Sequence, residues 1–313
     1  MTSSSGNGLS WCRRHSRFSR SVQEPCSRGW SQTEYFPGST RWPSSKMGRS
    51  TSSVVAQFAP GEDKAANVDT MIGLLTQAAE RGAQLVVLPE FAVFTAPAMD
   101  DRFVDSAEPL DGPSVTRLAR VSAELGVSVV VGLNEPAGDG RIHNTLVALQ
   151  DGAIAAVYRK VHLYDAFGYK ESDRVLAADP STPQLLELDG FRIGMQTCYD
   201  LRFPETTRWL VDAGADVIAL PAEWVPGPLK EYHWNTLLRA RAIENTVYVV
   251  AADQIAPGGS GNSAILDPMG IPLAALGEAE GVGVAVLERD RLDTVRTINP
   301  ALTLRRYRVE PGH

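Results

Sequence analysis

Three side chains that could do chemistry follow three separate apolar runs of the sequence. Glu90 follows QLVVLP, Lys160 follows AAVYR and Cys198 follows FRIGMQT. Short apolar runs bounded by turn residues predict buried strands, so we expect each polar group at the carboxyl end of a strand. Each one alone has an ordinary explanation, because such a Glu or Lys is usually solvated and a Cys is usually core filler. Their joint placement predicts a site, since ligands of open α/β sheets bind at that edge.

A thiol, an ammonium and a carboxylate together can cleave an amide. The thiolate is the nucleophile; a nearby ammonium stabilises it, and a carboxylate can take the thiol proton as general base. The same carboxylate can then protonate the leaving amine, while the ammonium and the backbone N–H after the Cys hold the oxyanion. These steps require no cofactor, and we expect none.

A Cys–His arrangement is the alternative, because His is the usual base for a cysteine nucleophile. His162 and His233 are both available. His162 follows Lys160 by two positions, so the two share a face if the strand continues. The spacing leaves this alternative open.

The elements that must position these groups begin at Ser53. SSVVAQFAP predicts a strand, a helical pattern covers about 63–81, and strand and helix patterns then alternate along the chain. This alternation predicts an α/β fold, and the turn at Asp151–Gly152 predicts a hairpin. Two segments, AAERGAQLVVLPE and LVDAGADVIALPAE, share the same order: the end of a helix, Gly-Ala, an apolar strand, Leu-Pro and a Glu. They indicate either two αβ units packed sheet on sheet, with helices outside, or two helix-to-strand turns built alike.

Residues 1–50 differ from the rest, being rich in Ser and Arg and poor in acidic residues. They predict a disordered tail or a start set before Met47, with a transit peptide as the alternative. We expect residues 51–313 to form the folded domain. Cys12 and Cys26 lie in the tail and receive no chemical role.

Composition excludes several classes of function. The 313 residues carry a formal net charge of −7 and have a pI near 5.3, which argues against a nucleic acid or an anionic membrane as partner. No apolar run reaches the roughly 18 residues of a membrane-spanning helix. Three scattered cysteines without C-x-x-C, and five histidines without H-E-x-x-H, predict no disulfide framework and no metal site. A reducing, cytoplasmic location is expected.

Five separated motifs occur in order: VVLPE, YRKVHLYDAFGYKES, CYDLRFPE, LLRARAIEN and NSAILDPMG. From about Ser53 to Arg306 the chain resembles the nitrilase, or carbon–nitrogen hydrolase, superfamily. It is most similar to the branch of ω-amidases and deaminated-glutathione amidases. The resemblance implies a four-layer α-β-β-α sandwich that forms a homodimer or a higher homo-oligomer. It also implies hydrolysis of a small linear amide through a thioester, with release of ammonia.

The resemblance assigns roles to matching positions. Glu90 is implied as general base and acid, Lys160 as oxyanion stabiliser and Cys198 as nucleophile. Glu171, in YKES, would orient Lys160 and the attacking water. The backbone N–H of Tyr199 would complete the oxyanion hole.

Two further residues are candidates for binding the substrate. Arg202 stands where carbamoylase relatives carry an arginine that grips the substrate carboxylate, and a guanidinium suits that task. Arg202 could equally pair with Asp200 or Glu205. Glu223, in LPAEW, stands where relatives usually carry a small residue. It is expected either in the pocket, disfavouring a substrate carboxylate, or at the surface.

Other functions use the same residues. An N-carbamoyl amino-acid hydrolase would yield carbon dioxide as well as ammonia, and an acyltransferase would deliver the thioester to an amine. A non-catalytic, metabolite-binding member of the fold belongs to a different class. The presence of Glu90, Lys160, Glu171 and Cys198 favours the enzyme.

Overall fold

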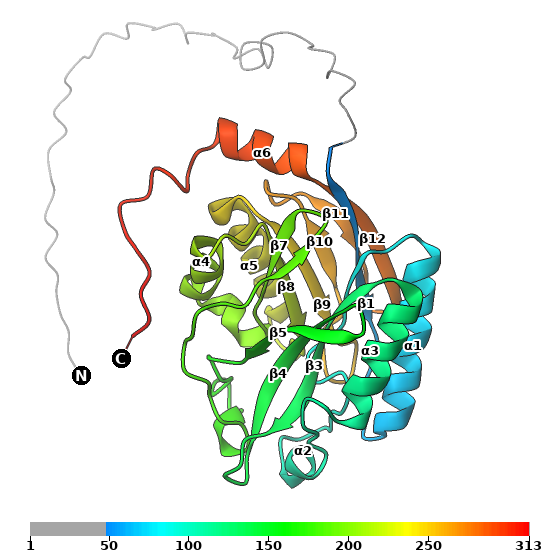
Figure 1. Cartoon of the computed structure of the whole chain (residues 1–313). Helices are drawn as coiled ribbons and strands as arrows, with labels where there is room; N and C mark the ends of the chain where they lie inside the picture. Colours follow the sequence, from blue (N-terminus) through cyan, green and yellow to red (C-terminus); the bar gives the residue numbers. More distant parts are fainter. Residues whose placement is uncertain (1–47, 313) are drawn as a thin grey trace, which may run out of the picture. The chain divides into compact units, whose positions relative to one another are not determined.

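Two six-stranded sheets lie face to face at the centre of the molecule. The computed structural model describes residues 48–312. One sheet is formed by β1 (Ser50–Gln57), β2 (Leu85–Val87), β3 (Ser128–Pro136), β4 (Ile142–Gln150), β5 (Ala153–Arg159) and β12 (Gly281–Glu288). The other is formed by β6 (Leu186–Leu188), β7 (Phe191–Met195), β8 (Val217–Ala222), β9 (Tyr248–Asp253), β10 (Ala264–Leu266) and β11 (Pro272–Ala275). The strand orders are β12-β1-β2-β3-β4-β5 and β11-β10-β9-β8-β7-β6. Most of these strands are labelled in Figure 1.

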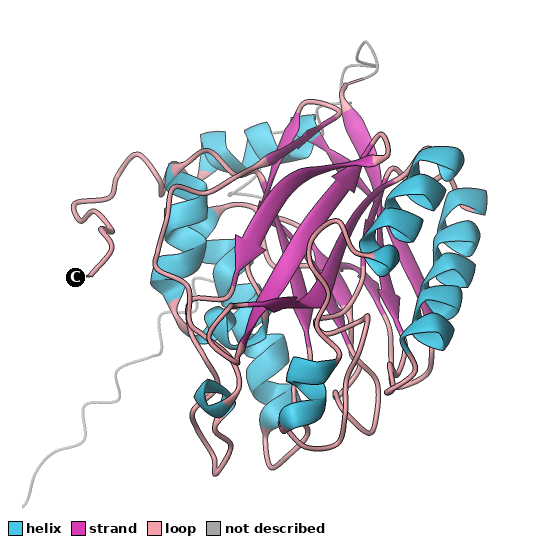
Figure 2. Cartoon of the chain, turned by 60° about the horizontal axis from the view of Figure 1, so that its bottom comes forward, coloured by secondary structure: helices cyan, strands magenta, loops and turns pink. Residues whose placement is uncertain are grey.

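Helices cover the outer face of each sheet (Figure 2). α1 (Lys64–Glu80) and α3 (Pro113–Leu125) pack on the first sheet, and α4 (Pro204–Asp212) and α5 (Lys230–Asn245) pack on the second. Shorter elements are α2 (Asp101–Asp105), η1 (Glu171–Asp173), η2 (Cys198–Arg202) and α6 (Arg289–Ile298). The α-β-β-α sandwich expected from the sequence is confirmed.

Alternation along the strands builds these layers. In β1, Val54 and Ala56 face the helices, whereas Val55 faces the second sheet. In β2, Val86 faces the helices and Val87 faces inward. Successive side chains of a strand point to opposite faces, so strands that are apolar on both faces must lie between two other layers.

Local signals in the sequence set the limits of the elements. Asp63 caps α1 by accepting a hydrogen bond from the backbone N–H of Ala66 at 3.1 Å. Gly126 ends α3 in the left-handed conformation, with φ of 67°. Asp151 and Gly152 both have positive φ, as the tight turn of the predicted hairpin requires.

Two predicted strands end earlier than their apolar runs. β2 stops at Val87 and β7 at Met195, so Glu90 and Cys198 lie in the loops that follow and not at the strand tips. The Glu90 loop passes close to β3: a Cβ atom on Gly132 would lie 2.8 Å from the Glu90 Cα. Apolar character marks burial and does not by itself mark strand hydrogen bonding, which explains the difference.

The predicted tail, with Cys12 and Cys26, falls outside the described residues apart from its last three positions. Strand β1 begins at Ser50, close to the predicted domain start. Within residues 48–312, no helix is both long enough and apolar enough to cross a bilayer.

Candidate active site

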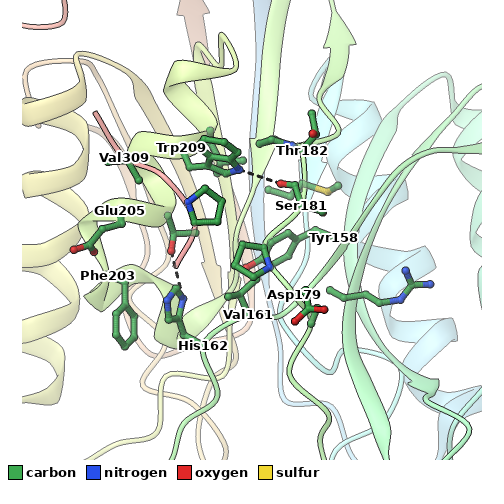
Figure 3. A pocket seen from close by; sticks show the side chains of 18 of the residues that line it. Tyr158, Val161, His162, Asp179, Ser181, Thr182, Phe203, Glu205, Trp209 and Val309 are labelled. Atoms are coloured by element: carbon green, nitrogen blue, oxygen red, sulfur yellow. Dashed lines mark hydrogen bonds between the residues drawn. The ribbon is translucent and has the colours of Figure 1, made fainter. Parts of the chain in front are cut away.

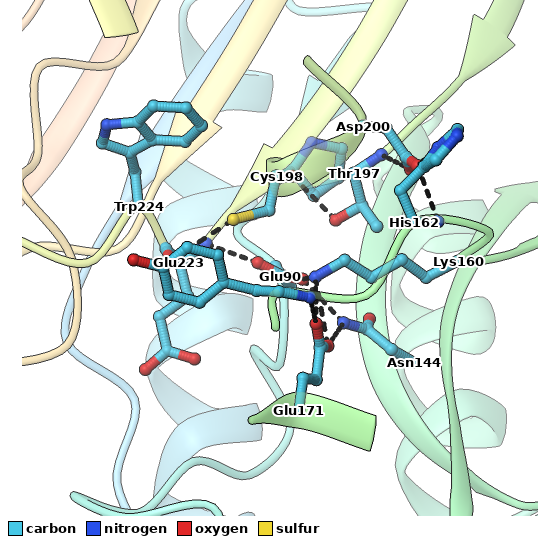
Figure 4. A network of polar contacts seen from close by, with 12 residues as sticks. Glu90, Asn144, Lys160, His162, Glu171, Thr197, Cys198, Asp200, Glu223 and Trp224 are labelled. Atoms are coloured by element: carbon cyan, nitrogen blue, oxygen red, sulfur yellow. Dashed lines mark hydrogen bonds and ion pairs between the residues drawn. The ribbon is translucent and has the colours of Figure 1, made fainter. Parts of the chain in front are cut away.

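Lys160 lies between two carboxylates at the end of β5. Its ammonium donates to Glu90 Oε1 at 2.9 Å and to Glu171 Oε2 and Oε1 at 2.9 and 3.1 Å (Figure 4). The three side chains are 1–2% exposed. β2 and β5 run in the same direction in the first sheet, so Glu90 and Lys160 lie at one edge of it, as predicted.

Asn144 completes this network and was missed in the sequence. Its side-chain amide donates to Glu90 Oε1 at 2.6 Å and to Glu171 Oε1 at 3.1 Å. It is fully buried in β4, and its backbone carbonyl accepts from the Lys160 N–H at 2.9 Å. A polar residue inside the otherwise apolar run NTLVALQ was the available signal, because a buried amide must find partners.

Cys198 comes from the second sheet and opens η2. Its φ of 44° lies in the left-handed region, which costs a non-glycine residue about 1–3 kcal/mol. The thiol donates to the backbone carbonyl of Glu223 at 3.4 Å and is 7% exposed. A nucleophile held on such a sharp turn projects its reactive atom away from the sheet.

Glu223 connects the sulfur to the general base. Its backbone N–H donates to Glu90 Oε2 at 2.7 Å, and its own carboxyl accepts from Thr95 Oγ1 at 3.3 Å. Glu223 therefore lies within the site (Figure 4). Burial, followed by the neighbouring Glu90 carboxylate, raises its pKa well above the ordinary value and favours the uncharged acid. The predicted bias against a substrate carboxylate required a negative charge on Glu223, and this buried environment disfavours that charge.

The thiol of Cys198 is held in its neutral form. Burial raises its pKa strongly, the Glu90 carboxylate adds to the rise, and Lys160 opposes it. The sequence led us to expect that an ammonium would stabilise the thiolate. Lys160 is instead shared by two carboxylates, so the site offers no net positive charge to the sulfur. The thiol must lose its proton to a base as it attacks.

The ammonium of Lys160 remains charged. Burial lowers its pKa, but the carboxylates of Glu171 and Glu90 outweigh burial and raise the pKa well above its ordinary value. Burial also raises the pKa of Glu171, while Lys160 and the backbone N–H of Tyr164 favour the carboxylate form. That N–H donates to Glu171 Oε2 at 2.6 Å.

Asp200 holds the segment that carries the nucleophile. Its carboxylate, fully buried, accepts from Tyr158 Oη at 2.6 Å and from the Thr197 N–H at 3.0 Å. His162 contacts it through Nδ1 at 2.8 Å and stacks on Phe203 with ring centres 3.8 Å apart. His162 is therefore engaged behind the nucleophile, and among the described residues Cys198 has no histidine partner. The Cys–His alternative is not supported.

Arg202 pairs with neither Asp200 nor Glu205. Its guanidinium carbon lies 4.8 Å from the centre of the Trp224 ring and 5.9 Å from that of Tyr199. The backbone N–H of Tyr199 has no acceptor among the described residues, as an oxyanion donor requires.

A separate cavity lies between residues of β5, of α4 and of the C-terminal segment (Figure 3). Its volume is about 520 Å³, and its lining includes Tyr158, His162, Trp209 and the C-terminal residues Val309–Gly312. Neither Glu90, Lys160 nor Cys198 lines it. In the described part of the chain, no three His, Cys, Asp or Glu side chains are grouped to hold a metal ion.

A family model for the carbon–nitrogen hydrolases matches residues 54–297. The deaminated glutathione amidase of Escherichia coli O157:H7 is 42% identical over 251 residues, which cover 80% of this chain and 95% of that protein. The omega-amidase of Xenopus tropicalis is 30% identical over 266 residues, covering 81% and 94%.

A solved structure is also similar. It is a mutant of the amidase from Nesterenkonia sp. AN1, with a TM-score of 0.69 and 24% identity, covering 83% of this chain and 98% of that one. In that structure, the acetamide moiety of fluoroacetamide is covalently added to the active-site cysteine. The fold, the family model and the relatives agree: this chain belongs to the carbon–nitrogen hydrolase, or nitrilase, family, and it is an amidase that hydrolyses amide C–N bonds.

Proposed function

We propose that the chain hydrolyses a small linear amide through a thioester on Cys198 and releases ammonia. The observation that carries the proposal is the convergence of Lys160, Glu90 and Glu171 beneath a buried thiol in a left-handed turn. The names of the relatives place deaminated glutathione and ω-amides among the first substrates to test.

In the first half-reaction, Glu90 takes the thiol proton as the sulfur of Cys198 attacks the amide carbon. The carbonyl π electrons move to the oxygen, and the Tyr199 N–H and the positive charge of Lys160 stabilise the resulting oxyanion. Glu90 then donates its proton to the amide nitrogen. The C–N bond breaks, ammonia leaves, and the acyl group remains on sulfur as a thioester.

Water completes the cycle. Glu90, again a carboxylate, takes a proton from the water as its oxygen attacks the thioester carbon. Collapse of the second oxyanion breaks the C–S bond, and the proton held by Glu90 returns to the sulfur. Glu171 accepts from Lys160, and Asn144 donates to both Glu90 and Glu171. These bonds hold Glu90 and Lys160 in place through both steps.

Cys198→Ala tests the proposal. We expect no release of ammonia from any amide in a panel of small amides, because no group is left to form the thioester. Mass spectrometry of the wild-type protein quenched during turnover should find the acyl adduct on the peptide containing Cys198. Circular dichroism and the melting temperature serve as controls for the fold. A folded alanine variant that releases ammonia at the wild-type rate would end the proposal.

A further inference from the structure

One stretch of backbone joins the general base to the nucleophile. The N–H of Glu223 donates to Glu90 Oε2 at 2.7 Å, and the carbonyl of Glu223 accepts from the Cys198 thiol at 3.4 Å (Figure 4). That carbonyl belongs to the peptide group whose N–H is on Trp224. The orientation of this peptide group therefore decides where the thiol proton points, and it helps to decide where one oxygen of the base lies.

Asp253 binds the opposite side of the same peptide group. The N–H of Trp224 donates to Asp253 Oδ1 at 2.7 Å. The peptide between Glu223 and Trp224 is trans, and in a trans peptide the N–H and the carbonyl point in opposite directions. The carboxyl of Asp253 and the sulfur of Cys198 therefore lie on opposite sides of one peptide group and hold it between them.

Asp253 ends β9 and is fully buried. Its second oxygen, Oδ2, accepts from the N–H and from the hydroxyl of Ser260, both at 3.0 Å. Burial raises the pKa of Asp253, and the three donors oppose the rise. Oδ1 can accept from Trp224 in the acid as well as in the carboxylate. A carboxyl group buried among neutral partners is costly, and such costs are typical of functional sites.

The residue after Asp253 holds the base itself. Gln254 is fully buried, and its side-chain amide donates to the backbone carbonyl of Glu90 at 2.9 Å. Its backbone N–H donates to the Ala222 carbonyl at 3.0 Å. The end of β9 therefore contacts both the loop that carries Glu90 and the segment that joins Glu90 to the nucleophile.

We propose that Asp253 is a positioning residue for the reaction. Its carboxyl, bonded to the Trp224 N–H, holds the Glu223 carbonyl toward the thiol and thereby keeps the Glu223 N–H on the general base. The inference rests on the proposed function, because Cys198 and Glu90 are the groups that Asp253 positions. Without the carboxyl, the peptide group is free to turn, and both reacting groups lose a fixed contact.

A purely structural role makes a different prediction. If Asp253 only stabilised the fold, each substitution should lower activity in step with the free energy of unfolding. If Asp253 positions the peptide group, activity should follow the presence of an acceptor for the Trp224 N–H, whatever the stability of the variant.

Asp253→Ser and Asp253→Asn separate the two roles. The Ser oxygen takes the place of the Asp Cγ atom and is too short to accept from Trp224, whereas Asn keeps an oxygen at Oδ1. Both variants lose the Oδ2 atom that accepts from Ser260, so both should be less stable than the wild-type protein.

The kinetic readout is turnover of the amide that the wild-type protein hydrolyses fastest. We expect kcat to fall about ten- to hundredfold in Asp253→Ser, with KM changed less than about threefold, and to fall less than about threefold in Asp253→Asn. Asp253→Thr, whose hydroxyl is equally short and whose branched side chain suits a strand, gives the same test if the Ser variant does not fold. Equal losses in the Ser and Asn variants, or an unchanged kcat in the Ser variant, would overturn the inference.

The S–H stretching band of Cys198 reports the contact without turnover. It is obtained as the infrared difference between each protein and its Cys198→Ala counterpart, in which the other thiols cancel. We expect the band to move to higher wavenumber in Asp253→Ser, because a weaker hydrogen bond leaves a stiffer S–H bond, and to stay near the wild-type position in Asp253→Asn. An unchanged or lowered band in Asp253→Ser would overturn the inference.

Asp267→Ser is the matched control. Asp267 is 3% exposed and follows β10 in the same sheet. It accepts from the N–H groups of Met269 and Ile271 at 2.8 and 2.9 Å and pairs with Arg291 at 2.6 Å. We expect a lower melting temperature, an unchanged S–H band and less than about a threefold change in kcat. Effects on the band and on kcat equal to those of Asp253→Ser would mean that lost stability explains both, and would overturn the inference.

The infrared readout keeps the inference separate from the proposed function. If Cys198→Ala still releases ammonia but the band moves in Asp253→Ser, the proposed function fails and the hold of Asp253 on the peptide group stands. If the acyl adduct on Cys198 is found but the band does not move, the proposed function stands and the inference fails.

Discussion

Cys198 is a thiol whose surroundings oppose its ionisation. Burial and the Glu90 carboxylate raise its pKa, and the ammonium of Lys160, which opposes the rise, is bonded to two carboxylates. The resting enzyme therefore stores its nucleophile as a neutral thiol, and reactivity arises only when substrate is present and Glu90 accepts the proton. Such a site protects the sulfur from solvent electrophiles, because the thiolate is the form that reacts with them.

The pH profile of Glu90→Gln tests this picture. Because the pKa of the wild-type thiol is raised, its alkylation rate should still be rising above about pH 9. The variant removes a negative charge that raises this pKa, so its alkylation profile should shift to lower pH. Its turnover should fall about 10²–10⁴-fold, since Gln cannot accept a proton.

A thiol that is alkylated at lower pH, together with slower turnover, would identify Glu90 as the base. Glu124→Gln, on the exposed side of α3, is the control and should alter neither quantity. An unchanged alkylation profile in Glu90→Gln would show that Glu90 does not influence the sulfur. Retained turnover would show that another group takes the proton.

At the scale of the element, η2 is held in a strained turn by groups on every side. Asp200 accepts from Tyr158, Thr197 and His162, and Arg241 donates to the Leu201 carbonyl at 2.7 and 3.1 Å. Left-handed backbone at a non-glycine residue persists only where surrounding contacts over-determine it. These contacts, and not the local sequence, account for the conformation of Cys198.

Asp200→Ala should remove that support. It leaves a buried hydroxyl, a backbone N–H and an imidazole without their acceptor, at an expected cost of about 3 kcal/mol in the free energy of unfolding. Turnover should fall as well, because the nucleophile is no longer positioned. Urea unfolding measures the first effect and ammonia release the second.

Glu205→Ala is the control for Asp200→Ala, because Glu205 is an exposed acid only five residues further along the chain. Its free energy of unfolding should change by less than about 0.5 kcal/mol. Wild-type stability in Asp200→Ala would mean that the buried carboxylate does not hold the segment.

At the scale of the whole molecule, the site exists because two sheets stack with their ligand-binding edges together. Glu90 and Lys160 follow strands of one sheet, and Cys198 follows a strand of the other. The apolar inner faces of both sheets form the core between them. Any change that shifts one sheet over the other separates the nucleophile from its base. The expectations of a homo-oligomer and of a cytoplasmic location stay predictions.

The domain limit can be tested by truncation. Residues 48–312 form a compact unit, and β1 begins at Ser50. We expect a protein lacking residues 1–46 to keep its melting temperature and its kcat/KM. A truncation that also removes β1 should not fold, because β1 lies between β12 and β2 inside the first sheet. Lost activity in the shorter truncation, with the fold retained, would assign the first segment a role in catalysis.

The sequence by itself determined the layers and the reacting groups. Apolar runs, the Asp151–Gly152 turn and the α/β alternation depend on local periodicity and local backbone preference, which can be read along the chain. Glu90, Lys160 and Cys198 stand next to such runs, so their approximate positions followed from them. The order of the motifs indicated the family in the same way.

Only the tertiary structure decided the partners of these groups. Asn144 between two carboxylates and a thiol with a raised pKa both depend on which side chains approach through space. The same holds for Arg202, which among residues 48–312 pairs with neither of its expected partners, Asp200 and Glu205. The stacking of the two sheets and their helices sets hydrogen bonding and burial. It brings together residues that are far apart in the sequence, so their contacts cannot be read from any single segment.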